Sequence, residues 1–303
     1  MDSKLPVSHR TGRSLDNIAA VSGSVAENPG TSIRHCSQQL DISRRTMQRS
    51  LTKDLHLHAY KIQLTQALKP TDHAQRREFV NCLFENQKVD GNFSKKIIFS
   101  DEAHFQLDGC VNTQNCRMWG AGNHRVIHEK VLHAQRPTVR CGFWAGGVTG
   151  PYFFENEAEN AVTVNGLSYR NKITDFLWPK LDNIEMEGMW FQHVGATCHN
   201  ARETTQLLRE EFPGRVISRN GDQNWPLRSC DLTPCDFFLW GFVKSRVYAN
   251  KPQTIPELKA EIRRVIGETE PQLCGNVIEN LVKRARVCQQ SRGGHLSDIV
   301  FHN

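Results

Sequence analysis

Two aspartates stand where a carboxylate could take part in chemistry. Asp101 follows the apolar run Ile97-Ile98-Phe99 closely, and such a run is typical of a buried strand. A carboxylate at the end of that strand is costly unless a cation pairs with it. Asp236 follows Pro234 at the predicted start of a helix, where the helix dipole alone favours an acidic residue. Taken separately, each aspartate is more often structural than catalytic.

The ten cysteines raise a second possibility, a metal site made of thiolates. Cys230 and Cys235 have four residues between them, which a zinc site could use, but no second Cys or His pair follows at a matching interval. Cys110 and Cys116 are too far apart for a zinc knuckle. Because no secretion signal opens the chain, we expect an intracellular protein whose thiols are reduced and half-buried.

A third group of side chains could contact nucleic acid. Residues 31–40 show a helical pattern, and Ser43 stands at the N-cap position of a second helix that continues to about residue 53. Two short helices with a tight connection predict a helix-turn-helix, whose second helix enters the major groove of DNA. The polar residues expected on the outer face of that helix are Arg44, Arg45, Gln48 and Arg49. The alternative is an ordinary amphipathic hairpin with solvated arginines.

Composition is compatible with DNA binding. The chain has 303 residues, a formal net charge of +6 and a mean hydropathy of −0.53. Residues 1–90 hold 13 basic and 9 acidic residues, so this third of the chain is the more basic part. No apolar run approaches the roughly 20 residues that cross a bilayer, and we expect no membrane partner.

The remaining pattern predicts a larger α/β domain that positions the aspartates. Alternating strands and helices of this kind form a mixed sheet covered by helices. We expect an N-terminal arm and helix-turn-helix region over 1–60, a linker helix over 61–92 and the larger domain over 93–303. The five predicted strands lie at about 96–100, 138–144, 152–154, 189–194 and 215–218, and predicted helices at 167–178, 199–212, 234–248 and twice within 255–290.

Three sequence blocks, in order, resemble the catalytic blocks of mariner-type transposases. They are Phe99-Ser100-Asp101-Glu102-Ala103-His104-Phe105, Trp190-Phe191-Gln192-His193-Val194-Gly195-Ala196-Thr197-Cys198-His199 and Ser229-Cys230-Asp231-Leu232-Thr233-Pro234-Cys235-Asp236-Phe237-Phe238. The tail Arg292-Gly293-Gly294-His295-Leu296 is similar to the family's C-terminal run. Residues 31–53 are similar to its second helix-turn-helix, and residues 12–21 are similar to the stretch before that motif. The resemblance covers nearly the whole chain.

This resemblance implies an RNase H-like core of the DDE/D class that cuts and rejoins DNA at transposon ends. In that class three carboxylates hold two Mg²⁺ or Mn²⁺ ions, which assist an in-line displacement at phosphorus. Asp101 corresponds to the first carboxylate and Asp236 to the third. The implied partner is transposon terminal-repeat DNA, with a homodimer possible, and the implied location is the nucleus.

The chain departs from the family pattern at the second carboxylate. That position is Val194, followed by Gly195-Ala196 and His199 as in the family, and 41 residues separate it from Asp236, as in one mariner-type subgroup. Valine cannot bind a metal ion, and its neighbour His193 should point to the other face of the strand. We also expect Glu102 to face away from Asp101, and Asp231 to be a turn or cap residue. Metal binding should therefore be weakened.

Three hypotheses remain open from the sequence. The first is a transposase-derived DNA-binding protein that is impaired in catalysis. The second is an active metal-dependent transposase or endonuclease with a substitute second ligand. The third is a relic of a mobile element without a selected role. Only one helix-turn-helix unit is expected, and Gly12-Arg13-Ser14 lacks the proline of a minor-groove hook, so DNA affinity should be reduced as well.

Overall fold

The structure is a computed structural model of the whole chain, and it describes residues 13–59, 66–107, 109, 136–156, 161–181, 187–195, 199 and 201–296. The sequence features at Gly12, Cys110, Cys116 and residues 196–198 lie outside these ranges. Contacts divide the chain into two compact units, one within residues 1–64 and one within residues 65–303. Each unit is described by itself.

The described part of the first unit, residues 13–59, contains three α-helices around a small apolar core. These are α1 (Leu15–Glu27), α2 (Ile33–Gln39) and α3 (Arg44–Arg49), and α3 continues into one π-helical turn, η2 (Ser50–Asp54). Each helix begins at a serine whose hydroxyl accepts a backbone N–H, namely Ser14, Ser32 and Ser43. The buried core residues are Val21, Cys36, Ile42 and Met47. For residues 1–30 the Ser-, Gly- and Asn-rich composition predicts a loose arm that leads to a short helix, whereas α1 is a helix of 13 residues.

The second unit is built on a six-stranded mixed sheet with the order β3-β2-β1-β4-β5-β6. Strands β1, β2 and β3 pair antiparallel, while β4, β5 and β6 run parallel to β1. All five predicted strands are present. The sixth, β6, has two residues and no apolar pattern. The strands are β1 (Ile97–His104), β2 (Thr138–Trp144), β3 (Gly147–Phe153), β4 (Trp190–His193), β5 (Val216–Ser218) and β6 (Gln223–Asn224).

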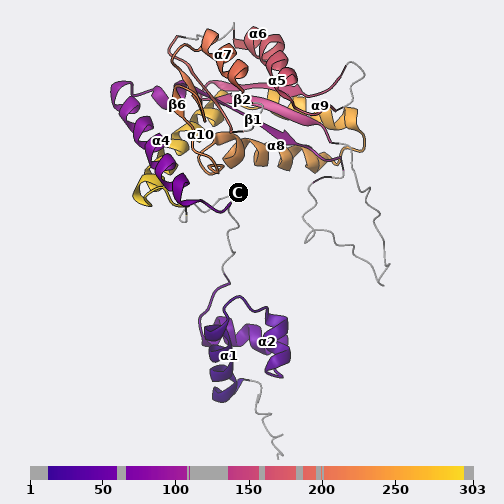
Figure 1. Cartoon of the computed structure of the whole chain (residues 1–303). Helices are drawn as coiled ribbons and strands as arrows, with labels where there is room; N and C mark the ends of the chain where they lie inside the picture. The colour runs from indigo at the N-terminus through magenta and orange to yellow at the C-terminus, as the bar shows by residue number, and fades with distance from the viewer. Residues whose placement is uncertain are drawn as a thin grey trace, which may run out of the picture. The chain divides into compact units, whose positions relative to one another are not determined.

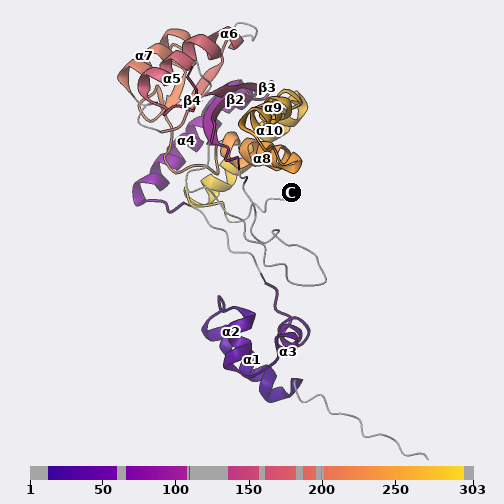
Figure 2. The same cartoon turned by 90° about the vertical axis from the view of Figure 1, so that its right-hand side faces the viewer.

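Helices cover both faces of this sheet (Figures 1 and 2). One face is covered by α5 (Gly166–Lys172), which continues through the π-helical turn η5 (Ile173–Leu177) into α6 (Trp178–Leu181), and by α7 (Arg202–Glu211). The other carries α4 (Pro70–Val89), the turn η6 (Cys235–Leu239) that leads into α8 (Trp240–Val247), α9 (Ile255–Gly267) and α10 (Pro271–Gln290). Two short 3₁₀ turns, η3 (Phe93–Lys96) and η7 (Tyr248–Asn250), complete the unit.

The alternation of strand β1 decides which side chains reach each face. Ile97, Phe99 and Ala103 belong to the larger core under α8 and α10, whereas Ile98 belongs to the core under α5 and α7. Asp101 therefore points toward α8, and Glu102 points to the opposite face. Within the described residues, no helix is both long and apolar enough to span a bilayer.

Candidate active site

Asp101 is buried in the middle of β1, which continues to His104 instead of ending near residue 100 as predicted, and 7% of its surface is exposed. The indole Nε1–H of Trp240, the first residue of α8, donates a hydrogen bond of 2.9 Å to its Oδ2 atom. Trp240 is itself 5% exposed and meets the ring of Phe105 edge-on, at 6.3 Å between ring centroids. Because both rings are packed, the N–H group holds one carboxylate oxygen of Asp101 in a fixed place.

Asp236 lies in the first turn of η6 and is hydrogen-bonded to Asp101. Burial, followed by the charges of Asp236 and Glu102, raises the pKa of Asp101 from 3.8 to about 7. Desolvation raises the pKa of Asp236 too, although the residue is exposed by its surface area, and the hydrogen bond with Asp101 and the charge of Lys244 oppose that rise. The structure thus brings the two predicted carboxylates together, and near neutral pH the pair retains a proton in the absence of a cation.

Val194 is the first residue after β4, the strand that lies beside β1 in the sheet. In the parallel ladder of β1 and β4, Phe99 pairs with Gln192 and Ser100 pairs with His193. The ladder ends at this pair, and the next residues along the chain are Asp101 in β1 and Val194, which follows β4. If the register continues by one residue, Val194 projects to the face of Asp101, and its isopropyl group offers no oxygen to a metal ion.

A buried polar network occupies the opposite face of the sheet. Arg140 of β2 donates to Glu102 at 2.7 Å and to the hydroxyl of Tyr169 at 2.6 Å. The ring of His199 lies between two oxygens, with Nε2 3.2 Å from Glu102 and Nδ1 3.2 Å from the carbonyl of Val194. Both ring nitrogens face acceptors, which suits the doubly protonated ring. The network therefore holds the backbone of position 194 in place from behind.

Glu102 is committed to this network as an anion. Burial alone would raise its pKa, but the charges of Arg140 and His199 lower the pKa of Glu102 to about 2. His193 lies on the same face, where its Nδ1 is 3.1 Å from the hydroxyl of Tyr169, and burial lowers its pKa well below 6.5. Neither Glu102 nor His193 faces Asp101, as the alternation of strand side chains predicts.

Asp231 is also unavailable as a substitute ligand. It lies in a turn, as expected, and both of its carboxylate oxygens accept hydrogen bonds from Arg76, at 2.7 and 2.6 Å. Among the described residues, no group of three or more His, Cys, Asp or Glu side chains could hold a metal ion. The donor set at this site is thus two carboxylates, Asp101 and Asp236. Their oxygen atoms suit one divalent cation, but β4 supplies no carboxylate for a second.

The four predicted DNA-contacting residues lie on the outer side of α3. Arg44, Arg45, Gln48 and Arg49 are exposed, while Met47 on the same helix is buried. None of the three arginines forms an ion pair within the described part of the chain. Arg13, in contrast, donates through Nε to Asp54 at 2.8 Å, which ties the start of α1 to the end of η2.

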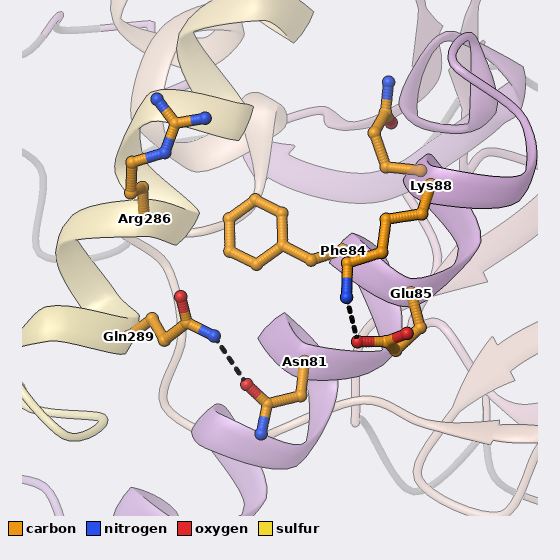
Figure 3. A pocket seen from close by; sticks show the side chains of 7 residues that line it. Asn81, Phe84, Glu85, Lys88, Arg286 and Gln289 are labelled. Carbon is orange, nitrogen blue, oxygen red and sulfur yellow. Dashed lines mark hydrogen bonds and ion pairs between the residues drawn. The ribbon is translucent and has the colours of Figure 1, made fainter.

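A separate hollow lies between α4 and α10 (Figure 3). Its lining is mostly polar and already internally bonded, because Lys88 pairs with Glu85 at 2.7 Å and Gln289 donates to Asn81 at 2.8 Å. It contains none of the residues that the sequence singles out, and we assign it no role.

Sequence reasoning missed three residues that shape the site. Trp240 follows Asp236 by four residues, and that helical spacing was a usable signal for a shared face. Arg140 stands alone as a charge in the apolar segment 138–144, which indicates a buried ion pair. Tyr169 gives no comparable signal, because it lies in α5 while its partners, Arg140 and His193, come from strands β2 and β4.

Comparison with known proteins places the chain beside transposases. No family model matches it. The Tc3 transposase of Caenorhabditis elegans is 27% identical over 292 residues, which cover 92% of this chain and 81% of that protein. The Mos1 transposase paired-end complex with left transposon end has a TM-score of 0.71 at 15% identity, covering 98% of this chain and 83% of that one.

Two further Mos1 structures agree. The mariner Mos1 paired-end complex with Mg has a TM-score of 0.69 at 16% identity, over 98% of this chain and 83% of that chain. The catalytic domain of Mos1 mariner transposase has a TM-score of 0.58 at 17% identity, over 78% of this chain and all of that domain. The predicted RNase H-like core with a preceding helical region is confirmed.

Proposed function

We propose that the chain, which is similar to the Tc3 transposase and has the fold of the Mos1 mariner transposase, is a transposase-derived DNA-binding protein with impaired catalysis. In this proposal residues 1–60 recognise DNA, the core retains two of three metal ligands, and the protein acts in the nucleus. Transposon terminal repeats are the proposed ligand, because the related Mos1 complexes contain transposon ends.

The observation that carries the proposal is the pairing of β1 with β4. Ser100 pairs with His193, and continuing this register by one residue sets Val194, just after β4, against Asp101. The resemblance to mariner-type transposases implies a carboxylate at this point, and among the described residues no third acid joins Asp101 and Asp236 in a group that could hold a metal ion. Glu102 and Asp231 are held by Arg140 and Arg76 instead.

The remaining residues can still perform part of the chemistry. When two divalent ions are bound, they activate the attacking oxygen and stabilise the leaving oxygen of a phosphodiester. Asp101 and Asp236 would hold one such ion. Trp240 orients Asp101, and Lys244 adds a positive charge near Asp236. Without a carboxylate at position 194 the second ion lacks a protein ligand, and cleavage should be slow.

The exposed arginines of α3 support the DNA-binding part of the proposal. Exposed guanidinium groups can contact phosphates or make paired hydrogen bonds to guanine, and Gln48 can do so to adenine. Ser43 and Met47 fix the helix so that these side chains stay on its outer face. Binding to terminal-repeat DNA should weaken steeply with salt. A gel-shift series that shows no complex even at low ionic strength would rule out DNA binding.

The test of impaired catalysis compares the unchanged protein with Val194→Asp and Val194→Asn. All three are incubated with terminal-repeat DNA and Mg²⁺ or Mn²⁺. We expect cleavage to rise at least about tenfold in Val194→Asp, since one ligand of a metal site is restored. The asparagine of Val194→Asn has nearly the same shape as an aspartate but no negative charge, so this variant is the matched control. Equal, robust cleavage by all three proteins would refute the proposal and favour an active enzyme with a substitute ligand.

The relic hypothesis concerns use by the host rather than chemistry. It is distinguished by expression and deletion in the source organism. Reproducible expression together with a deletion phenotype contradicts a relic, whereas DNA binding in vitro alone is compatible with it.

A further inference from the structure

Arg76 in α4 is a buried charge whose hydrogen-bonding capacity is fully used. Its side chain is 0% exposed, and its five N–H donors are all engaged. Nη1 donates to Ser229 Oγ at 2.9 Å and to Asp231 at 2.7 Å, and Nη2 donates to the other oxygen of Asp231 at 2.6 Å. The last two bonds reach the backbone, from Nε to the carbonyl of Gly293 at 3.0 Å and from Nη2 to that of Gly294 at 3.2 Å.

These acceptors lie in two segments that are remote in sequence. Ser229 and Asp231 belong to the loop that leads into η6, which carries Asp236. Gly293 and Gly294 belong to the C-terminal tail after α10. Gly293 has φ +83°, and a Cβ atom there would lie 2.2 Å from the carbonyl oxygen of His73, so only glycine lets the tail approach α4 this closely.

Two more arginines hold the same loop. Arg228 forms a two-pronged ion pair with Asp72 of α4, with one of its bonds at 2.6 Å. Arg284 of α10 donates to the backbone carbonyl of Asp231. Its guanidinium also lies 3.7 Å from the ring centroid of Phe237, the residue after Asp236. Contacts from α4 and α10 thus fix both the start of the loop and its end.

The segment between Asp231 and Asp236 is short and stiff. Leu232 donates its backbone N–H to Ser229 at 2.9 Å, and Phe237 donates to Thr233 at 3.0 Å. Leu232 and Thr233 are buried. A displacement of Asp231 therefore reaches Asp236 without being absorbed by a flexible linker.

We propose that Arg76 is the positioning residue for the third acid, Asp236, and that α4 and the glycine pair of the tail belong to the support of the carboxylate pair. Arg76 touches neither Asp101 nor Asp236. It acts by fixing the loop whose next helical turn presents Asp236 to Asp101. The effect on metal binding rests on the proposed function, while the effect on the geometry of the pair does not.

The test uses Arg76→Lys in the full chain, with Arg77→Lys as the matched control. Lysine keeps the charge but cannot make the two-pronged bond to Asp231 or replace five donors. Arg77 is the next residue of the same helix, exposed, and donates to the tail at the carbonyl of Arg292, at 2.7 Å. Far-UV circular dichroism and thermal unfolding establish that both variants are folded at the temperature of measurement.

The first readout is the NMR signal of the Trp240 indole N–H in metal-free protein, assigned with Trp240→Phe. This group donates to Asp101, which is bonded to Asp236, so a moved Asp236 alters its chemical shift. We expect a shift in Arg76→Lys and none in Arg77→Lys. An unchanged signal in folded Arg76→Lys overturns the inference. If Arg76→Lys does not fold, the isosteric Asp231→Asn is read in the same way, and an unchanged signal there overturns it.

The second readout is Mn²⁺ affinity, measured by electron paramagnetic resonance in the unchanged and the Val194→Asp backgrounds. We expect the dissociation constant to rise about tenfold or more in Arg76→Lys and to change less than twofold in Arg77→Lys. Equal affinity in folded Arg76→Lys overturns the inference. If no background binds Mn²⁺, the proposed metal function fails, and the indole signal alone decides the role of Arg76.

Discussion

Replacing Asp101 by asparagine should stabilise the metal-free protein at alkaline pH, although it removes a candidate ligand. Asparagine has the same shape and can still accept the Trp240 bond. The native pKa of about 7, against 3.8 for the ordinary group, means that ionising this carboxyl destabilises the folded chain. At about 1.4 kcal/mol per pKa unit, that cost is up to about 4 kcal/mol above pH 7.

The dependence on pH has a definite sign. Because the pKa of Asp101 is raised on folding, the folded state holds the proton more tightly, and stability falls as pH rises from about 4 to about 7. The gain in Asp101→Asn should therefore be largest at pH 8, smaller at pH 5 and nearly absent at pH 4.

Urea unfolding with a chelator, followed by tryptophan fluorescence, measures this gain. All six tryptophans lie beyond residue 64, so the signal reports the core unit alone. Asp175→Asn, an exposed position in the same unit, is the control and should change the midpoint little. An Asp101→Asn midpoint at pH 8 no higher than that of the unchanged protein, or an equal gain at pH 8 and pH 4, contradicts the reasoning.

Three further predictions concern other parts of the chain. Glu102→Gln should destabilise the core by about 3–5 kcal/mol at pH 7, because it leaves the buried guanidinium of Arg140 without its anion, and urea unfolding measures this loss. The unchanged chain should lose the same contribution to its stability as pH falls from about 4.5 to about 2, since Glu102 then becomes protonated. Trp240→Phe should lower core stability at pH 8 by about 1.5–3 kcal/mol, because a charged carboxylate loses a donor, and an unchanged midpoint argues against that bond. The double variant Arg44→Ala, Arg45→Ala should bind DNA more weakly than the unchanged protein. In a plot of log affinity against log salt concentration, its slope should be shallower by about one for each arginine–phosphate contact that is lost. Arg34→Ala, on the exposed side of α2, is the comparison, and an equal loss of affinity there refutes a special role for α3.

The sequence predicts the elements of the core well because their side-chain periods are regular. The apolar run before Asp101 and the segment 138–144 are both strands in the structure. It underestimates α1 and misses β6. The Ser- and Gly-rich composition predicts only a loose arm and a short helix, whereas the Ser14 cap and the packing of Val21 stabilise a helix of 13 residues. The Gln-Asn pair of β6 has no pattern, and only pairing with β5 makes it a strand.

The site is predictable to the extent that it depends on local alternation. Because strand side chains alternate, the sequence predicts that Glu102 faces away from Asp101, and the structure places it with Arg140. The contacts that support the site join distant parts of the chain. Trp240 is 139 residues from Asp101 and Arg76 is 155 residues from Asp231, so only the folded structure reveals these pairs.

A calorimetric titration of the full chain with Mn²⁺, for the unchanged protein and Val194→Asp in parallel, tests the central claim most directly. The site now has two carboxylates, and we predict one weakly bound ion per chain in the unchanged protein. We predict two ions, bound more tightly, once position 194 carries an aspartate. Two tightly bound ions in the unchanged protein would contradict the account, because another group would then be completing the site.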